Sequence, residues 1–474
     1  MDIGGIARVI LVDLEVAVLV YFVAISTFYA VLLASAAAEM RAHVLRIRGE
    51  SRWRVLSSAV APSISMLAPA FNEASTISDS VRALLTLSYP NLEIVIINDG
   101  SRDGTLDVLR RELSLVPLHP IFRRTIRTRP VRGLYRSGEH PTLLVIDKEN
   151  GGKADSLNAG LNVASADLVC AIDADTLIEP DALQRMVRPF LEGDQVLAAG
   201  GTIRVANSSI VRQGRVAQAH VPGSPLPGFQ VIEYLRAFLF GRLGWNRLGG
   251  NLIISGAFGL FRRQSMLAIG GYTSDTVGED MEVVVRLRRG ARENGQPDAV
   301  RFIPDPVAWT EVPSSLRVLG RQRDRWHRGL ADVLWRHRAV LFNPRYGAFG
   351  LVVYPYFVLV ELLAPVIEAI GLIGLVVGLV VGAVDVPFAI LFFCVAYGYG
   401  LNLSLATLLL EELSFRRYAG LRDHALLLLW AVLENFGYRQ LTVLWRLRGL
   451  VNYLRRRTTW GAMERRGFAG APKT

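Results

Sequence analysis

"DLVCAIDADT", residues 167–176, joins a short apolar run to two aspartates. An apolar run that ends in polar residues is typical of a strand buried in a parallel sheet. Asp173 and Asp175 are one residue apart, so their carboxylates point to the same side of an extended chain. Ligands of open α/β sheets bind at the carboxyl ends of strands, where such a pair can hold Mg²⁺ or Mn²⁺ with phosphate oxygens. The alternative is a solvated turn that follows a strand.

Three more apolar runs predict neighbouring strands of the same sheet. They are residues 63–69, 92–99 and 142–147, and helical patterns separate them. This alternation is typical of an α/β domain with a mostly parallel sheet. We expect the domain to cover residues 62–312.

Polar and glycine-rich turns follow these strands. In "INDGSRDGT" (residues 97–105), Asp99 can accept hydrogen bonds from a nucleobase or ribose, and a plain turn is the alternative. "NGGKADSLNAGL" (residues 150–161) carries Lys153 into a predicted helix. A lysine at a helix N-terminus is suited to bind an anion such as a diphosphate.

Apolar segments flank the α/β region. Residues 16–38 contain no charged residue and are long enough to cross roughly 30 Å of hydrocarbon. Basic residues follow, so we expect an uncleaved span with everything after Met40 in the cytosol. Residues 351–382 and 386–410 are apolar again. Residues 425–447 contain charges that each cost roughly 2.5–3.5 kcal/mol in a membrane centre, which favours an interfacial or re-entrant helix over a polar-lined span.

The composition excludes several classes of protein. The formal net charge is +11, but the positive residues gather beside the apolar segments, so we expect no nucleic acid partner. Cys170 and Cys394 lie far apart in apolar surroundings and predict neither a disulfide nor a zinc site. The sequence contains no P-loop, no G-x-G-x-x-G and no G-x-S-x-G motif.

Taken together, these patterns predict an α/β domain inserted between membrane helices. The expected segments are an N-terminal transmembrane helix (1–40), a basic cytosolic linker (41–61), the α/β domain (62–312), amphipathic interface helices (313–347), C-terminal transmembrane and interfacial helices (348–447) and a basic cytosolic tail (448–474).

The motifs of the α/β region resemble glycosyltransferase family 2, the nucleotide-sugar-dependent enzymes with a GT-A fold. The resemblance rests on "APAFNE" (68–73), "YPNLEIVIINDGSRDGT" (89–105), "NGGKADSLNAGL" and "IDADT" (172–176). Three later motifs are similar to its processive membrane branch, which includes the cellulose, hyaluronan and poly-N-acetylglucosamine synthases. They are "SGAFGLFRR" (255–263), "VGEDMEVVVRL" (277–287) and "QRDRW" (322–326).

The resemblance implies a role for each matching residue of the donor site. It places four residues around the uridine: Ala68, Asn72, Glu73 and Asp99. It puts Lys153 on the donor side, and it gives Asp173 and Asp175 the diphosphate and its metal ion.

The catalytic base implied by the resemblance is Asp280, with Glu279 as the second choice. Gly278 stands where the family usually has threonine, but both carboxylates are present. Glycosyl transfer needs a base for the acceptor hydroxyl and a cation for the departing diphosphate. One base opposite the leaving group gives inversion in a single displacement.

"QRDRWHRGL" (residues 322–330) precedes the first long apolar segment of the C-terminal half. By resemblance, Gln322 and Arg325 contact the donor diphosphate and Trp326 stacks on the acceptor sugar, because the three share one helical face. The alternative is a basic flank with an interfacial tryptophan anchor. Ser255 and Gly256 are expected to border the acceptor.

The function implied is an inverting, metal-dependent membrane glycosyltransferase that polymerises a β-linked polysaccharide from a UDP-sugar and helps to translocate it. UDP-N-acetylglucosamine is the first donor and UDP-glucose the second. The alternatives are a transferase that adds one sugar to a lipid-linked acceptor and a catalytically silent nucleotide-binding membrane protein. We expect a multi-pass protein of the cell membrane with a cytosolic catalytic domain, in contact with lipids and with an accessory membrane subunit.

Overall fold

The computed structural model describes residues 3–49, 61–119, 124–173, 176–193, 195–212 and 214–456. The chain divides into two compact units. The sheet unit contains residues 41–222 and 249–312, and the helical unit contains residues 1–40, 223–248 and 313–462. Each unit is described by itself below.

The described residues of the sheet unit form a ten-stranded sheet in the order β3-β4-β5-β2-β1-β6-β11-β8-β12-β7. Its middle consists of the four predicted strands, which pair in parallel: β5 (Leu143–Lys148), β2 (Leu92–Asp99), β1 (Ile64–Ala70) and β6 (Leu168–Ile172). The prediction of these strands is confirmed. β6 ends at Ile172, before the predicted boundary, so Asp173 is the first residue beyond the strand.

The rest of the sheet mixes both strand directions. β8 (Val196–Val205) and β12 (Ala299–Thr310) pair in parallel, but β11 (Phe258–Arg262) runs antiparallel between β6 and β8. The edges are antiparallel too, formed by β7 (Leu177–Ile178) on one side and by β3 (Leu115–Leu118) with β4 (Val131–Ser137) on the other. The expected mostly parallel sheet therefore has antiparallel additions, and β11 begins at the edge where β6 ends.

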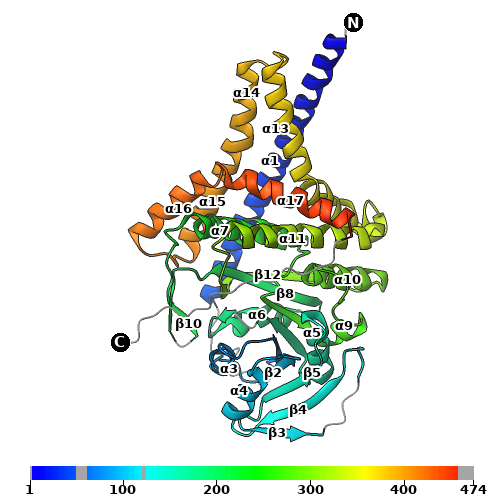
Figure 1. Cartoon of the computed structure of the whole chain (residues 1–474), viewed down its shortest axis with the longest axis vertical. Coiled ribbons are helices and arrows are strands. Elements are labelled where there is room, and N and C mark those ends of the chain that lie inside the picture. The colour runs from blue at the N-terminus through cyan, green and yellow to red at the C-terminus, as the bar shows by residue number, and fades with distance from the viewer. Residues whose placement is uncertain are drawn as a thin grey trace. The chain divides into compact units, whose positions relative to one another are not determined.

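Helices connect the strands of the sheet unit (Figure 1). They are α3 (Ile77–Leu85), α4 (Thr105–Glu112), α5 (Lys153–Val163), α6 (Ala182–Glu192), α9 (Arg263–Ala268) and α10 (Glu279–Glu293). Leu157 and Leu161 of α5 and Val283 and Val284 of α10 are buried in one core with the strand residues. Burying one such side chain contributes about 1.5–3 kcal/mol to folding. This core holds the first turns of α5 and α10 against the sheet.

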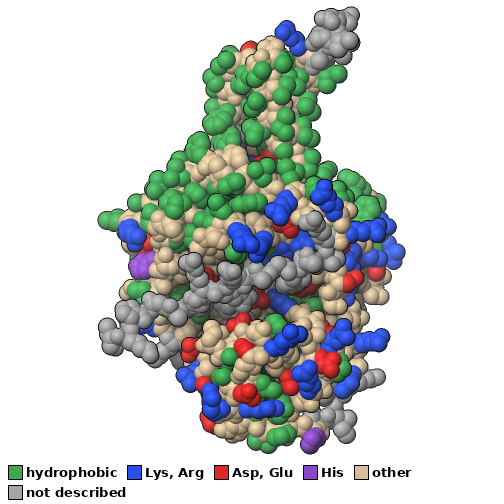
Figure 2. Space-filling model, viewed as in Figure 1, with side chains coloured by type: hydrophobic (Ala, Val, Ile, Leu, Met, Phe, Trp, Pro, Cys, Tyr) green, Lys and Arg blue, Asp and Glu red, His purple; other side chains and the backbone are tan. Residues whose placement is uncertain are grey.

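Most of α1 (Ile3–Gly49) belongs to the helical unit. It includes Arg8–Ile47, the one described helix that is long and apolar enough to cross a membrane. A second candidate is the bent pair Phe349–Leu362 and Ala364–Val380, with 43° between its halves. In Figure 2, hydrophobic side chains gather over α1, α13 (Ala364–Val380) and α14 (Val386–Phe393). The expected span at residues 16–38 lies inside α1, which continues through the first part of the expected linker.

The two remaining apolar segments are interrupted helices. Residues 386–410 are divided among α14, a π-helical turn at Cys394–Gly398 and α15 (Tyr399–Ser414). Residues 425–447 are divided between α16 (Leu421–Leu433) and α17 (Tyr438–Leu454), which are separated at Gly437 with φ +85°. The chain is thus not one continuous helix over 425–447, and its place in a membrane stays a prediction. The basic tail from residue 457 lies outside the described residues.

Candidate active site

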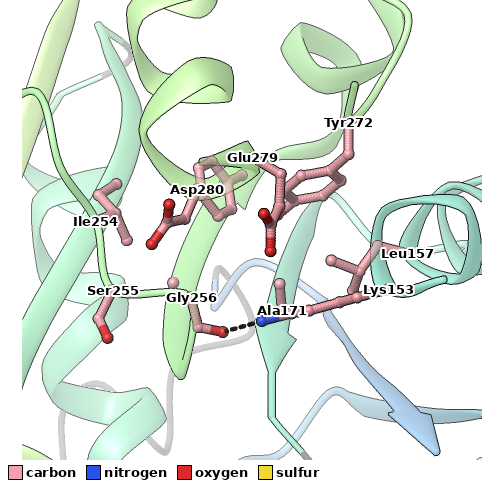
Figure 3. A pocket seen from close by; sticks show the side chains of 11 residues that line it. Lys153, Leu157, Ala171, Ile254, Ser255, Gly256, Tyr272, Glu279 and Asp280 are labelled. Atoms are coloured by element: carbon pink, nitrogen blue, oxygen red, sulfur yellow. Dashed lines mark hydrogen bonds between the residues drawn. The ribbon is translucent and has the colours of Figure 1, made fainter. Parts of the chain in front are cut away.

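A pocket opens at the carboxyl edge of the parallel strands (Figure 3). Lys153 comes from the start of α5, and Glu279 and Asp280 come from the start of α10. The apolar side of the pocket includes Leu157 and Tyr272. Its volume is about 280 Å³ including the open mouth. The predicted donor-side lysine and both candidate bases therefore line the same space.

Lys153 joins the predicted metal ligand to this pocket. Its Nζ lies 2.5 Å from Oδ1 of Asp173 and donates to the Gly256 carbonyl at 3.1 Å. Burial alone would lower the pKa of Lys153, but the carboxylates of Asp173, Glu279 and Asp280 outweigh it and raise that pKa. The ammonium is therefore held charged among three carboxylates.

The two acids of α10 occupy its first turn, where the partial positive charge of a helix N-terminus stabilises carboxylates. Oδ1 of Asp280 accepts a hydrogen bond from the Met281 N–H at 2.9 Å. Burial raises the pKa of Glu279 to about 6, against the opposing attraction of Lys153. Both side chains point into the pocket (Figure 3). Either carboxylate can therefore accept a proton there.

Gly256 leaves room for this arrangement. A Cβ added at Gly256 would lie 3.1 Å from Nζ of Lys153 and 3.6 Å from Oδ2 of Asp280. A larger side chain would displace the lysine or the aspartate. Ser255 and Gly256 thus line the pocket as the sequence suggests, while their contact with an acceptor stays a prediction.

Asp99 is buried and holds the loop that precedes α5. Oδ1 accepts hydrogen bonds from Nζ of Lys148 at 2.7 Å and from the Gly151 N–H at 2.9 Å. Oδ2 accepts from the Gly152 N–H at 2.8 Å and from the Asn150 side chain at 3.2 Å. Asp99 thereby holds in place the loop that leads to Lys153. The contact of Asp99 with a uridine stays a prediction.

Lys148 is a neighbour of the candidate site to which the motifs gave no role. Its side chain is fully buried and bridges Asp99 and Asp155, with 2.7 Å from Nζ to each carboxylate. Removing one partner of a buried ion pair strongly destabilises the folded protein, because the other charge is left without compensation. The available signal was a lysine at the end of an apolar strand, directly before the glycine-rich loop.

The other predicted uridine residues lie in β1 and on the loop that follows it. Ala68 is buried within β1. Asn72 adopts a left-handed conformation with φ +57°, and its Oδ1 accepts from the Arg102 N–H at 2.8 Å. The Glu73 N–H donates to the Thr105 hydroxyl at 2.9 Å. These contacts join the loops after β1 and β2, and none of the three residues lines the pocket.

The carboxylate of Asp173 is a ligand of the type that a divalent cation binds. Its Oδ1 already faces a cation, the Lys153 ammonium, and carboxylate oxygens are the ligands that Mg²⁺ and Mn²⁺ prefer. Asp175, the predicted second ligand, lies outside the described residues. Among the residues that the structure describes, no group of three or more His, Cys, Asp or Glu side chains forms a metal site.

Gln322, Arg325 and Trp326 lie on α11 (Leu316–Arg336) of the helical unit. Trp326 is exposed, and Gln322 and Arg325 are partly exposed. Gln322 has a buried Oε1 without a hydrogen-bond partner among the described residues. Cζ of Arg323 lies 4.4 Å from the centroid of the Trp326 ring. The indole therefore has a cationic neighbour and an accessible surface.

The remaining polar residues of this stretch face the interior of the helical unit. Asp324 accepts from the Asn452 amide at 2.5 Å and lies 3.2 Å from Arg328. Burial, followed by the charge of Arg446, lowers the pKa of His327 to about 3. This face packs against α17, as the contact of Gly449 with the Asp324 backbone shows. The packing explains the residues of "QRDRWHRGL" to which the resemblance gives no role.

The fold and the pocket define the class of the protein. A GT-A-type α/β sheet that brings a lysine, an aspartate after β6 and an acidic helix start to one edge is the domain of a glycosyltransferase.

The family matches agree with this class. Residues 65–269 match the family "Glycosyl transferase family 2", and residues 168–403 match "Glycosyl transferase family group 2". Together the two matches run from residue 65 to residue 403, more than half of the chain. The chain belongs to glycosyltransferase family 2.

Curated relatives include poly-beta-1,6-N-acetyl-D-glucosamine synthases. The protein from Staphylococcus aureus is 30% identical over 275 residues, which are 58% of this chain and 56% of that protein. The protein from Staphylococcus epidermidis is 29% identical over 274 residues, again 58% and 56%. This chain therefore spans little more than half the length of the relatives that it matches.

Among solved structures, the mannosyltransferase PcManGT from Pyrobaculum calidifontis, in complex with GDP-Man and Mn²⁺, is similar with a TM-score of 0.47 and 21% identity. The similarity covers 87% of this chain and 99% of that one.

Proposed function

We propose that the protein is an inverting, divalent-cation-dependent glycosyltransferase that uses a UDP-sugar to extend a β-linked polysaccharide. One observation carries the proposal. The acids of α10 share one pocket with Lys153, and Lys153 is paired with Asp173, so a proton acceptor lies beside charged groups suited to a diphosphate and its cation. UDP-N-acetylglucosamine is the first donor, a choice supported by the names of the staphylococcal relatives, and UDP-glucose is the second.

The roles of the residues follow from this geometry. Asp280 takes the proton of the acceptor hydroxyl, and Glu279 is the second candidate because its raised pKa suits proton transfer near neutral pH. Asp173 and Asp175 hold the cation, which when bound stabilises the charge of the departing diphosphate. Lys153 supplies a second positive charge on that side. With one of these carboxylates acting as a base on the face opposite the leaving diphosphate, the acceptor displaces it in a single step and the anomeric configuration is inverted.

The helical unit is proposed to embed the protein in the cell membrane through more than one span, with the catalytic domain in the cytosol. The candidate spans α1 and Phe349–Val380 support this placement. A growing polysaccharide, membrane lipids and an accessory membrane subunit are the proposed partners, and no nucleic acid is expected. Translocation of the polymer through the helical unit belongs to the same proposal.

Release of UDP from a series of UDP-sugars tests the proposed function. Protein purified in detergent or reconstituted in lipid vesicles should release UDP with Mn²⁺ or Mg²⁺ and an acceptor oligosaccharide. EDTA should stop the reaction, and adding back the cation should restore it. Linkage analysis of the product identifies the sugar and the bond. Absence of turnover with every common donor, with acceptors and partner subunits supplied, would favour a silent nucleotide-binding protein.

The rival function is the transfer of one sugar to a lipid-linked acceptor. Its product carries a single added residue, whereas a polymerase gives a ladder on a gel. Processive synthesis is favoured by the accessible ring of Trp326, because an indole offers a flat apolar surface to a sugar ring.

Trp326→Ala is expected to shorten the product and to raise the acceptor concentration needed for half-maximal rate. Loss of nucleobase stacking on an aromatic ring typically costs about 1–3 kcal/mol. A loss of that size for a sugar ring corresponds to about fivefold to 150-fold in acceptor affinity. Gel analysis of product length and acceptor titration measure both effects.

Trp335→Ala is the matched control for this variant. Trp335 lies on the same helix, is exposed and has the Arg338 guanidinium 5.0 Å from its ring centroid, as Trp326 has Arg323. Equal losses in the two variants would show that the acceptor role assigned to Trp326 is wrong.

A further inference from the structure

Asn158 of α5 fastens the chain segment that leads to the catalytic acids. Its Oδ1 accepts from the Tyr272 N–H at 2.7 Å, and its Nδ2 donates to the Tyr272 carbonyl at 2.8 Å. The side chain is buried, at 5% exposure. Both ends of one amide thus bind both polar groups of one residue, as a neighbouring strand would.

The same segment is held from α10. The guanidinium of Arg286 donates to the Ile269 carbonyl at 2.5 Å and to the Gly271 carbonyl at 2.6 Å. It is itself paired with the buried Glu282 at 2.8 Å. Gly270 and Gly271 both have left-handed backbones, with φ +80° and +75°. A Cβ at Gly271 would lie 2.2 Å from Oδ1 of Asn158, so the clamp requires glycine there.

This clamp connects the two helices that supply the reactive groups. Asn158 lies on α5, whose first residue is Lys153, and Tyr272 precedes α10, whose first residues are Glu279 and Asp280. The Tyr272 ring also lines the pocket beside Glu279 (Figure 3). A shift of Tyr272 would therefore change the position of the base relative to the lysine and the donor side.

The chain contains a second clamp of the same design one helical turn later. Oδ1 of Asn162 accepts from the Ile126 N–H at 2.9 Å, and its Nδ2 donates to the Ile126 carbonyl at 2.8 Å. Asn162 is buried at 7% exposure. Ile126 belongs to the segment between β3 and β4 and does not line the pocket. The two asparagines thus differ mainly in what they hold.

We propose that Asn158 is a positioning residue for glycosyl transfer, which sets the distance between the base on α10 and Lys153 on α5. The inference rests on the proposed function, and it assigns no contact between Asn158 and a substrate. A small displacement of a catalytic group is sufficient to lower a rate by about a hundredfold. Binding of the sugar donor should change less. The loop that leads to Lys153 is held separately, by hydrogen bonds from the Gly151 and Gly152 N–H groups to Asp99.

Asn158→Ala and Asn162→Ala form a matched pair for the test. Each substitution removes two buried hydrogen bonds between a side chain of α5 and the backbone of another segment. Both should therefore lower the melting temperature by similar amounts. Asn158→Ala should lower kcat about tenfold to a hundredfold while the donor KM and UDP affinity stay within about twofold. Asn162→Ala should leave kcat within about twofold of the wild type.

Equal kcat losses in the two variants, or an Asn158 effect confined to KM, would overturn the inference. If Asn158→Ala does not fold, Asn158→Asp and Asn162→Asp are compared by the same criteria, since aspartate keeps the bond from the Tyr272 N–H and loses the donation. Hydrogen exchange gives a readout that does not depend on turnover. Amides from Tyr272 to Asp280 should lose protection in the Asn158 variant and keep it in the Asn162 variant.

The activity of the wild type distinguishes failure of the proposed function from failure of the positioning role of Asn158. A wild-type protein that releases no UDP contradicts the proposed function, while hydrogen exchange still decides whether Asn158 holds the acidic helix start. An active wild type with unchanged kcat in Asn158→Ala contradicts the positioning role alone.

Discussion

Asp280→Asn is expected to abolish glycosyl transfer while UDP still binds. The amide keeps the size of the side chain and can still accept from the Met281 N–H, so the start of α10 is preserved. It cannot take a proton from the acceptor hydroxyl. Loss of a general base lowers kcat by about 10²- to 10⁴-fold. UDP release measures the rate, and calorimetric titration with UDP and Mn²⁺ measures binding.

Two other variants test whether the loss of activity is specific to Asp280. Asp275→Asn removes an exposed carboxylate from the loop before α10 and should leave the rate unchanged. Glu279→Gln should lower the rate of UDP release less than Asp280→Asn does. If Glu279→Gln is inactive and Asp280→Asn makes normal polymer, the base is Glu279, and its raised pKa is then the relevant property.

Asp173→Asn is expected to remove the metal dependence together with the activity. The substitution takes one anionic ligand from the cation and the carboxylate from Lys153, whose Nζ lies 2.5 Å from it. A cation at a departing diphosphate contributes several kcal/mol, which corresponds to a loss of about a hundredfold or more in rate. UDP binding should become weak and equal in Mn²⁺ and in EDTA.

Asp181→Asn is the control for this variant. Asp181 is also a partly exposed aspartate in an ion pair, at 2.7 Å from Arg185, but its partner does not line the pocket, whereas Lys153, the partner of Asp173, does. It should keep the activity and the metal dependence. A variant at Asp173 that still binds UDP more tightly with Mn²⁺ would show that the cation is held elsewhere.

The sequence predicted the central strands well because each is a short apolar run followed by a turn. The antiparallel strand β11 was not predicted, since its residues, Phe258–Arg262, were recognised only as part of a motif. Its direction depends on a partner far away in the chain, between β6 and β8. Such pairings are decided by packing of the whole sheet and leave little local pattern.

The sequence predicted the pocket residues that stand in motifs, but for a similar reason it did not predict the contacts that hold them. Lys153, Glu279 and Asp280 stand in motifs, and the fold brings them into one pocket. Asp99 also stands in a motif, but its partner Lys148 and the loop amides determine what its carboxylate contacts. Asn158 was part of a quoted motif without an assigned role, because its partner is the backbone of Tyr272. A backbone partner leaves no trace in residue identity.

The burial of Lys148 has a consequence for the ionic strength at which the protein can be studied. Buffer ions screen charges that are exposed to solvent, with a Debye length of about 8 Å at physiological salt, and screen buried pairs much less. Lys148 is fully buried with Asp99 and Asp155, so added salt leaves the loop before Lys153 in place. A fall in donor affinity with salt therefore reports the attraction of an anionic nucleotide to the exposed charges around the pocket, not a loosening of the architecture beneath it.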